Sequence, residues 1–390
     1  MVRDKFLVFG SPKIEKEEIS EVVDCLKSGW IGTGKKVIAF QEKFKKYKSC
    51  EYATALNSCT AALHLAMVVT GITVGDEVIL PAMTFAATAN AIIHAGATPV
   101  FVDCEKNTAN IDPLAIESKI TKKTKAIIPV HFAGRPCNMN DIMDLAKKYR
   151  LKVIEDCAHA IEAEYHGIKT GRFGDIGCFS FYVTKNIITG EGGMIITDNK
   201  NYANLIKILS LHGMSKDAWE RFGEKGFKHY QVVLPGYKYN MMDLQAAIGL
   251  HQLDRVERYW QRRKYIWEKY NDAFAELPVY CPAPTEENTK HSYHLYTLML
   301  DIEHLNITRD QFLDEMTKRN IGVGVHYISL HLQPFYRNKY KLKEMSFPNS
   351  KWISERTVSI PLSPKLSDTD VEDVINTVRY ILKKKNSDIK

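Results

Sequence analysis

Amphipathic segments alternate with short apolar runs through the first half of the chain. Residues 17–29, 60–71 and 140–150 carry apolar side chains at helical spacing, which predicts three helices. Short runs rich in Val and Ile predict buried parallel strands at residues 76–81, 98–104, 125–132 and 151–157. The alternation predicts an α/β fold, with helices covering a mostly parallel sheet.

A second region follows a long helical pattern at residues 242–277. Beyond it, three segments predict a strand, a helix and a strand, in that order: residues 291–300, 308–320 and 321–328. The chain has 390 residues, more than one hydrophobic core usually serves. We therefore predict a large domain, residues 1–250, and a smaller C-terminal α+β domain, residues 251–390.

Composition narrows the functional classes. Hydrophobic residues make up 45% of the chain and charged residues 25%, as in ordinary globular proteins. The net charge is +7, but only residues 381–390 concentrate lysines, so we expect neither nucleic-acid nor membrane binding. No apolar stretch reaches the ~18 residues of a membrane span, and no signal-peptide pattern opens the chain. The eight cysteines form no C-x-x-C pair, which favours reduced thiols in a cytoplasmic protein.

Three residues with chemical potential follow predicted strands where the apolar runs stop. Asp156, beside Glu155, ends one run, Lys185 follows another, and Phe85 lies just beyond Pro81. Ligands of open α/β sheets bind outside the carboxyl ends of the strands. A pyridoxal 5'-phosphate site requires an amine for the cofactor aldehyde, a carboxylate for the ring nitrogen and an aromatic ring for the ring face. These residues therefore predict pyridoxal 5'-phosphate as the cofactor.

A phosphate site is predicted at the start of the helix 60–71. Ser58, Cys59 and Thr60 follow a strand-like run, and the free N–H groups of a helix N-terminus favour an anion. Taken singly, these features are usually a surface lysine, a capping carboxylate and an ordinary N-cap. Their joint occurrence in strand order favours cofactor chemistry.

Two other patterns resemble ligand sites, and we reject both. Residues 29–36 match the spacing of a nucleotide-binding P-loop, but Lys36 stands where Ser or Thr should bind the metal, and the segment follows a helix. His326 and His331 have no carboxylate signature nearby, so we predict no metal site. Such histidines are packed or face a substrate, and we assign His326 to substrate binding.

The segment 153–198 resembles the central signature of the DegT family, pyridoxal phosphate-dependent nucleotide-sugar aminotransferases of fold type I. The resemblance extends over nearly the entire chain, through residues 28–37, 81–103, 129–139, 211–219, 235–253 and 325–336. It implies a large domain, whose mostly parallel seven-stranded sheet is flanked by helices, and a smaller α+β C-terminal domain.

The resemblance also implies roles for individual residues. Lys185 bonds the cofactor aldehyde, Asp156 pairs with the ring nitrogen, and Phe85 stacks on the ring. His159 lies near the ring and its phenolic oxygen, and completes the catalytic set. The cofactor phosphate is held by Ser58, Cys59, Thr60 and Ser180.

A homodimer with two shared active sites is implied as well, in which a neighbouring subunit completes each phosphate site. Many family members have Asn-Tyr-Arg-Met where this chain has residues 238–241, Lys-Tyr-Asn-Met. The exchanged polar residues leave open whether Lys238 or Asn240 reaches the phosphate, and we favour Asn240.

The resemblance implies L-glutamate as amino donor and a sugar nucleotide as acceptor. The Lys-Tyr-Asn form and Glu191 after the lysine favour a 4-keto sugar nucleotide. A 3-keto sugar nucleotide, a cyclitol or an aromatic-amine precursor remains an alternative acceptor, as does a non-catalytic regulator that binds cofactor or sugar. Dehydratases of this fold have histidine in place of the lysine, and Lys185 argues against that class.

Overall fold

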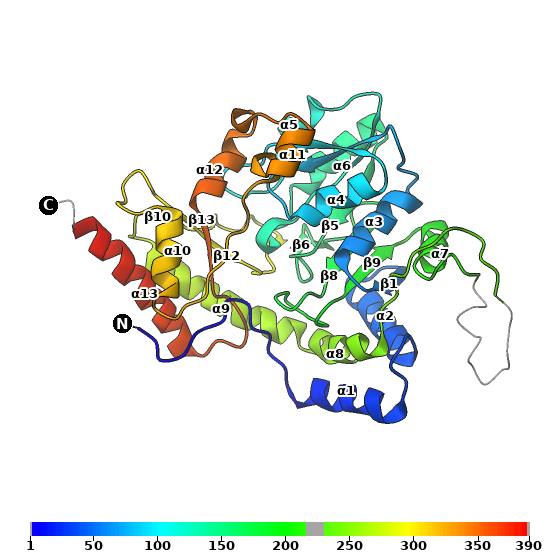
Figure 1. Ribbon diagram of the computed structural model, residues 1–390, viewed down its shortest axis with the longest axis horizontal. Coiled ribbons are helices and arrows are strands. Elements are labelled where there is room, and N and C mark those ends of the chain that lie inside the picture. The colour runs from blue at the N-terminus through cyan, green and yellow to red at the C-terminus, as the bar shows by residue number, and fades with distance from the viewer. Residues whose placement is uncertain (1, 216–229, 388–390) are drawn as a thin grey trace.

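A seven-stranded sheet forms the centre of the computed structural model, which describes residues 2–215 and 230–387 (Figure 1). In spatial order its strands are β1 (Tyr52–Leu56), β9 (Gly193–Thr197), β8 (Ile176–Ser180), β5 (Lys152–Asp156), β4 (Thr124–Ile127), β2 (Glu77–Pro81) and β3 (Thr98–Val102). β9 is antiparallel to both neighbours, and all other neighbouring pairs are parallel. The sheet confirms the predicted α/β class.

Helices cover both faces of this sheet (Figure 1). One face packs against α3 (Cys59–Val69), α4 (Ala86–His94) and α7 (Lys200–Leu209). The other packs against α2 (Lys35–Lys48), α5 (Pro113–Glu117), α6 (Met139–Tyr149) and α8 (Asp243–Asp254), and α1 (Lys16–Ser28) lies on α8. Successive strand residues point to opposite faces, so Val153 and Ile154 enter different apolar clusters. Burial on both faces explains the continuous apolar runs.

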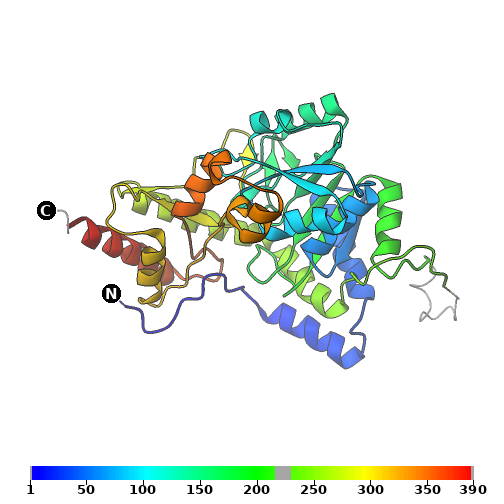
Figure 2. The ribbon, with the colours of Figure 1, turned by 45° about the horizontal axis from the view of Figure 1, so that its top comes forward.

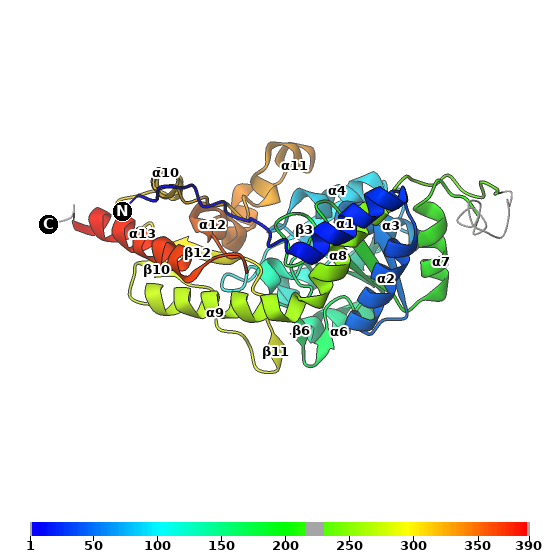
Figure 3. The same ribbon diagram turned by 90° about the horizontal axis from the view of Figure 1, so that it is seen from below.

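The smaller region has its own core and is joined to the sheet by α9 (Val256–Phe274), as Figure 3 shows. Its antiparallel sheet contains β10 (Val279–Tyr280), β12 (Tyr296–Leu300) and β13 (Thr357–Ile360). Its helices are α10 (Arg309–Thr317), α12 (Pro348–Arg356) and α13 (Asp368–Ser387), whereas α11 (Pro334–Lys339) packs through Tyr336 on α4 of the larger region. A minor sheet joins β11 (Thr289–Lys290) to β6 (Glu164–Tyr165) and β7 (Ile168–Lys169) of the larger region.

Two predictions for the second half are wrong. Residues 321–328 do not form a strand: Ile321 and Gly324 make only isolated bridges, to Leu7 and Ser359, and β13 is the third strand instead. The ladder does not continue past Gly324, because the next carbonyl facing β13, that of His326, accepts from the Thr357 hydroxyl instead of from a backbone amide. The long helical pattern 242–277 is divided at Arg255 into α8 and α9.

The N-terminal segment packs on the smaller region before the chain enters the larger one (Figure 2). Arg3 forms ion pairs with Asp370 and Asp373 of α13, and Leu7 bridges Ile321. Early residues thus belong spatially with late ones. The domain boundary after residue 250 lies inside α8 and stays a prediction.

Other expectations concern the chain as a whole. None of the helices described is long and apolar enough to cross a bilayer. All eight cysteines are free thiols, and seven of them are buried. The family-like segment 211–219 lies partly outside the described residues.

Candidate active site

Three of the predicted residues meet where β5 and β8 end and α3 begins. Lys185 follows β8, Asp156 ends β5, and Cys59 opens α3. The charges of Lys185 and Asp156 act on each other and on the Cys59 thiol, whose pKa burial raises well above its usual value. The carboxyl edge of the sheet therefore brings an amine and a carboxylate together, as the strand ends predict.

Asp156 is buried and holds two hydrogen bonds. Its Oδ2 accepts from the Thr88 hydroxyl at 2.9 Å, and its Oδ1 accepts from the Ala158 amide at 3.1 Å. Burial raises the pKa of this carboxyl, and the two hydrogen bonds lower it, with a net upward shift. A cation at this point would stabilise the ionised form, which suits a partner for a protonated ring nitrogen.

Glu155, the neighbouring carboxylate, points to the opposite face, as a strand requires. It is fully buried and accepts a 3.1 Å hydrogen bond from His131 Nε2. Its oxygens also accept from three backbone amides at 2.7–2.8 Å, those of Gly171, Phe173 and Gly174. These bonds fix the turn before β8, so Glu155 is a structural carboxylate.

Glu155 belongs to a group of three residues whose side chains could act as metal ligands, but their hydrogen bonds explain the group without a metal ion. His131, Glu155 and Cys157 each place one ligand atom within 4.8 Å of the others. However, His131 Nδ1 accepts from the Cys137 amide, and its Nε2 donates to Glu155. Burial raises the pKa of Cys157 well above its usual value, which keeps the thiol protonated. The group is a hydrogen-bonded part of the core.

The Lys185 amine is uncommitted within the described part of the chain, because none of its residues accepts a hydrogen bond from Nζ. Its backbone is fixed by a 2.9 Å bond from its N–H to the Tyr182 carbonyl. Burial lowers the pKa of this amine to about 8, while Cys59 and Asp156 act in the opposite direction. About a tenth of Lys185 is therefore neutral, hence nucleophilic, at pH 7, far more than of an ordinary lysine with a pKa of ~10.4.

The predicted phosphate residues also lie together. Ser58 is the N-cap of α3, and its hydroxyl accepts from the Ala61 amide at 3.1 Å. Ser180 pairs with Gly193 across β8 and β9, and a Cβ on Gly193 would lie 2.4 Å from the Ser58 carbonyl carbon. Only glycine permits this close approach. Thr60 is exposed in the first turn of the helix.

The His159 side chain is buried, and its hydrogen-bond partners determine which ring nitrogen carries the proton. Its Nδ1 accepts from the Ala133 amide at 3.2 Å, so the proton lies on Nε2, which donates to the Tyr327 hydroxyl at 3.1 Å. Burial, with the charge of Lys185, lowers its pKa well below the usual value. His159 is therefore a neutral donor, and its ring stacks on that of Tyr327 at 6.2 Å.

A buried polar network supports His159 from behind. The His294 ring lies 4.4 Å from the His159 ring, and its Nδ1 bonds Asn186 Oδ1 at 2.9 Å. Asn186, next to Lys185, donates to Glu162 at 2.8–2.9 Å. Burial raises the pKa of Glu162 to about 7. The network ties the residue after the lysine to the ring that packs on His159.

Phe85 and His326 lie at the rim. Phe85 is the N-cap of α4 and is 60% exposed, with its ring 5.9 Å from Tyr327. His326 bonds Ser359 Oγ at 2.8 Å, and burial and the charge of Lys185 lower its pKa to about 4. His326 is therefore uncharged near neutral pH, and it lies close enough to Lys185 for that charge to lower the His326 pKa, as we expect of a residue that faces the substrate.

Lys238 and Asn240 lie beside the phosphate residues of their own chain. The Tyr239 carbonyl accepts a hydrogen bond from the Asn57 amide at 2.7 Å, and Asn240 forms an isolated antiparallel β-bridge with Leu56. Asn240 Nδ2 donates to Thr33 at 2.6 Å, while its buried Oδ1 has no partner among the described residues. The Lys238 side chain is exposed. Which of the two reaches a cofactor phosphate stays a prediction.

Sequence reasoning missed Tyr327, Thr88, His294 and Asn186. Two of them carried a signal: Tyr327 follows His326, and Thr88 lies three residues after Phe85, one helical turn on. His294 and Asn186 carried none, because their partners lie more than a hundred residues away or on another element.

Comparisons with known proteins identify the family. The model of the DegT/DnrJ/EryC1/StrS aminotransferase family matches residues 12–379. The uncharacterized protein MJ1066 of Methanocaldococcus jannaschii is 50% identical, over 98% of this chain and 99% of its own length. The spore coat polysaccharide biosynthesis protein SpsC of Bacillus subtilis is 47% identical, over 98% of both chains. The putative sugar aminotransferase Spr1654 of Streptococcus pneumoniae, PMP-form, superposes with a TM-score of 0.90 at 35% identity, over 98% of this chain and 99% of that one.

The fold and its structural neighbours define a fold-type I aminotransferase. The chain belongs to the DegT/DnrJ/EryC1/StrS aminotransferase family.

The lowered pKa of Lys185 can be measured directly. In cofactor-free protein, the rate of reductive methylation of Lys185 by formaldehyde should rise with pH to half its maximum near pH 8, because only the neutral amine reacts. Mass spectrometry of the peptide that contains Lys185 gives the rate. The same peptide in denatured protein is the control and should follow a lysine pKa of ~10.4. Identical profiles in the two states would contradict the burial argument.

Proposed function

We propose that this enzyme transfers an amino group from L-glutamate to a 4-keto sugar nucleotide. One observation carries the proposal: in a chain of this family, a buried lysine with a lowered pKa and a buried aspartate meet beside the Ser58 and Cys59 turn. Pyridoxal phosphate is the cofactor, in line with the PLP-form and PMP-form of the Streptococcus pneumoniae neighbour. When bound, it accepts the amino group and delocalises carbanion electrons into its ring.

The residues present fit this group. Lys185 supplies an unpaired amine, and Asp156 supplies a carboxylate that a ring cation would ionise. The Cys59 and Thr60 amides and the Ser180 hydroxyl would hold the phosphate, and Gly193, which has no side chain, lets the Ser58 and Cys59 backbone approach the Ser180 strand pair closely. Phe85, exposed at the rim, would cover one face of the ring and exclude water from it.

Each residue has a separate task during transfer. Asp156 keeps the ring nitrogen protonated, which strengthens the ring as an electron acceptor. The Lys185 amine would move a proton at the substrate carbon in each half-reaction. His159 stays neutral because burial lowers its pKa, and its Nε2–H donates a hydrogen bond that orients the Tyr327 hydroxyl.

The acceptor is assigned from weaker signals. The Lys-Tyr-Asn segment at residues 238–240 and Glu191 favour amination at C4, and the SpsC relative, by its name, makes a polysaccharide. A 3-keto sugar nucleotide or a cyclitol would use the same cofactor residues. A non-catalytic regulator would keep the cofactor without transferring amines.

A homodimer with shared sites completes the proposal. Five apolar side chains in and after α1 are each 39–59% exposed: Ile19, Val23, Leu26, Trp30 and Ile31. Contiguous exposed apolar residues mark interaction surfaces. Asn240 lies next to this region through its bond to Thr33. A second copy seated there would bring the Asn240 loop near the partner's phosphate residues.

The reaction itself is tested with purified holoenzyme, L-glutamate and a panel of 4-keto and 3-keto sugar nucleotides. 2-Oxoglutarate should form with a 4-keto acceptor, and Lys185→Ala should lower the rate by about 10²–10⁴-fold, since the proton carrier is lost. Production with 3-keto acceptors alone would move the assignment to C3. A coloured protein that forms no 2-oxoglutarate with any acceptor would indicate a regulator.

Substitution of the two adjacent carboxylates should have different effects, one on turnover and the other on stability. Asp156→Asn should lower turnover by about 10²–10³-fold with little change in thermal stability, because an amide cannot hold the ring nitrogen protonated. Glu155→Gln should retain more activity but lower the unfolding free energy by about 1–3 kcal/mol, since its NH₂ would face backbone donors. Equal activity losses at equal stability would reverse the assignment.

Mixed dimers test the shared site. If Asn240 acts across the interface, a dimer of one Lys185→Ala chain and one Asn240→Ala chain gathers both defects in one site. The other site is then whole, and about half of wild-type activity per dimer should return. If Asn240 serves its own chain, each site carries one defect and no activity is regained. Mass spectrometry of the mixture confirms that hybrids have formed, and Lys238→Ala in place of Asn240→Ala examines the alternative residue.

A further inference from the structure

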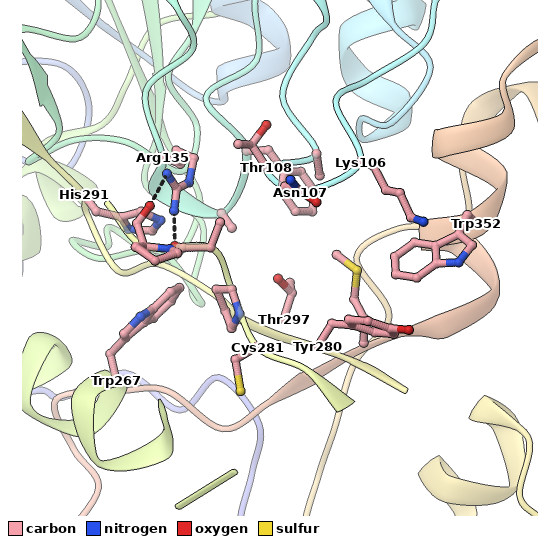
Figure 4. A pocket seen from close by; sticks show the side chains of 17 residues that line it. Lys106, Asn107, Thr108, Arg135, Trp267, Tyr280, Cys281, His291, Thr297 and Trp352 are labelled. Atoms are coloured by element: carbon pink, nitrogen blue, oxygen red, sulfur yellow. Dashed lines mark hydrogen bonds between the residues drawn. The ribbon is translucent and has the colours of Figure 1, made fainter. Parts of the chain in front are cut away.

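A cavity of about 460 Å³ lies between the larger and the smaller region, apart from the predicted active-site residues (Figure 4). Residues 106–109, 132, 133 and 135 contribute one side, and residues 280–284 with part of β12 contribute the other. Its size lies within the ~300–1,000 Å³ typical of small-molecule sites, which favour the interfaces between domains. We propose that this cavity binds a nucleoside monophosphate and that binding is transmitted to His159.

Aromatic side chains line the cavity. Tyr280 and Trp352 meet edge to face at 5.3 Å, Phe132 lies in the wall toward the active site, and Trp267 lies at one end. Such surfaces recognise a planar ring by stacking. The mouth carries a cation, because the exposed Lys106 amine lies 4.4 Å from the Trp352 ring centroid (Figure 4). A flat ring that bears an anion complements this pair.

Two polar groups in the cavity have no protein partner among the described residues. His291 is 3% exposed, and its Nδ1 accepts from the Tyr293 amide at 2.8 Å, so Nε2 carries a proton that no described group accepts. Burial lowers the pKa of His291 well below its usual value. The Thr297 hydroxyl is likewise unpaired, and Figure 4 shows it pointing into the cavity.

These groups select the class of ligand. A simple aromatic hydrocarbon would leave the His291 donor and the Thr297 hydroxyl unsatisfied, whereas the edge of a nucleobase pairs with both. Arg135 cannot be the anion site, because it already bonds Glu286 at 2.6 Å and two backbone carbonyls. Lys106 is therefore the group that would meet a phosphate at the mouth.

Phe132 and Ala133 lie between the cavity and the active site, and the Ala133 amide is hydrogen-bonded to His159. The Phe132 ring lies 6.3 Å from the His159 ring and 6.0 Å from that of Tyr327. The Ala133 amide donates the hydrogen bond that fixes the His159 tautomer. A ligand that moves Phe132 or Ala133 therefore changes the environment of His159. This coupling rests on the proposed role of His159, while binding does not.

Binding is tested by titrating the holoenzyme with uridine 5'-monophosphate, followed by calorimetry and by tryptophan fluorescence. Lys106→Met and Thr297→Val, which keep side-chain volume, should each weaken binding by about tenfold or more, and Lys119→Met, an exposed lysine elsewhere, should not. Uridine should bind more weakly than its phosphate. Absence of binding, or equal affinity in wild type, Lys106→Met and Thr297→Val, would overturn the site, since the nucleotide would then bind elsewhere.

Coupling has its own measurement. Saturating uridine 5'-monophosphate should shift the visible absorbance of the bound cofactor in wild type and in Lys119→Met, and should require a much higher concentration in Lys106→Met. A shift that is absent while binding persists would overturn the coupling alone. Loss of amine transfer from glutamate, by contrast, bears on the proposed function and leaves the binding result standing.

Discussion

A parallel sheet with both faces buried can carry charged side chains only where its strands end or where every polar atom has a partner. β5 shows both cases in adjacent residues. Glu155 lies inside the sheet and accepts four hydrogen bonds, which hold the turn before β8. Asp156 lies one position later and accepts two hydrogen bonds. Its charge also acts on the Lys185 amine. The chemistry of the protein depends on that single step along the strand.

The smaller region contributes further side chains around His159, which lies near the edge of the large sheet. Tyr327 and His294, both from that region, contact the two sides of the His159 ring, and Asn186 links His294 to the residue after the lysine. Contacts from the smaller region therefore add to the Ala133 hydrogen bond that fixes the His159 tautomer. Residues 321–328 form only isolated bridges at Ile321 and Gly324, and further along this segment the His326 and Tyr327 side chains bond Ser359 and His159.

Sequence reasoning succeeded where local pattern and function coincide. The ends of β5 and β8 are visible as the points where apolar runs stop, so Asp156 and Lys185 could be placed at one edge before any coordinates existed. It failed where a contact spans the chain. Nothing local indicates that Tyr327 meets His159, 168 residues away, or that Asn240 bonds Thr33. β13 was missed because its four residues are recognisable only through their pairing with β12.

The turn at residues 132–134 shows how rigid packing can connect two sites. Ala133 adopts a left-handed conformation with φ of 55°, and Gly134 has φ of 99°, where an added Cβ would lie 3.0 Å from the His159 carbonyl oxygen. The amide of Ser292 bonds Gly134 and that of His294 bonds Ala133, so the turn is clamped between the two regions. Close-packed interiors shift between discrete arrangements rather than deform gradually. Phe132 and Ala133 line the cavity on one side and contact the His159 ring on the other, so a shift of this turn at one site would be felt at the other.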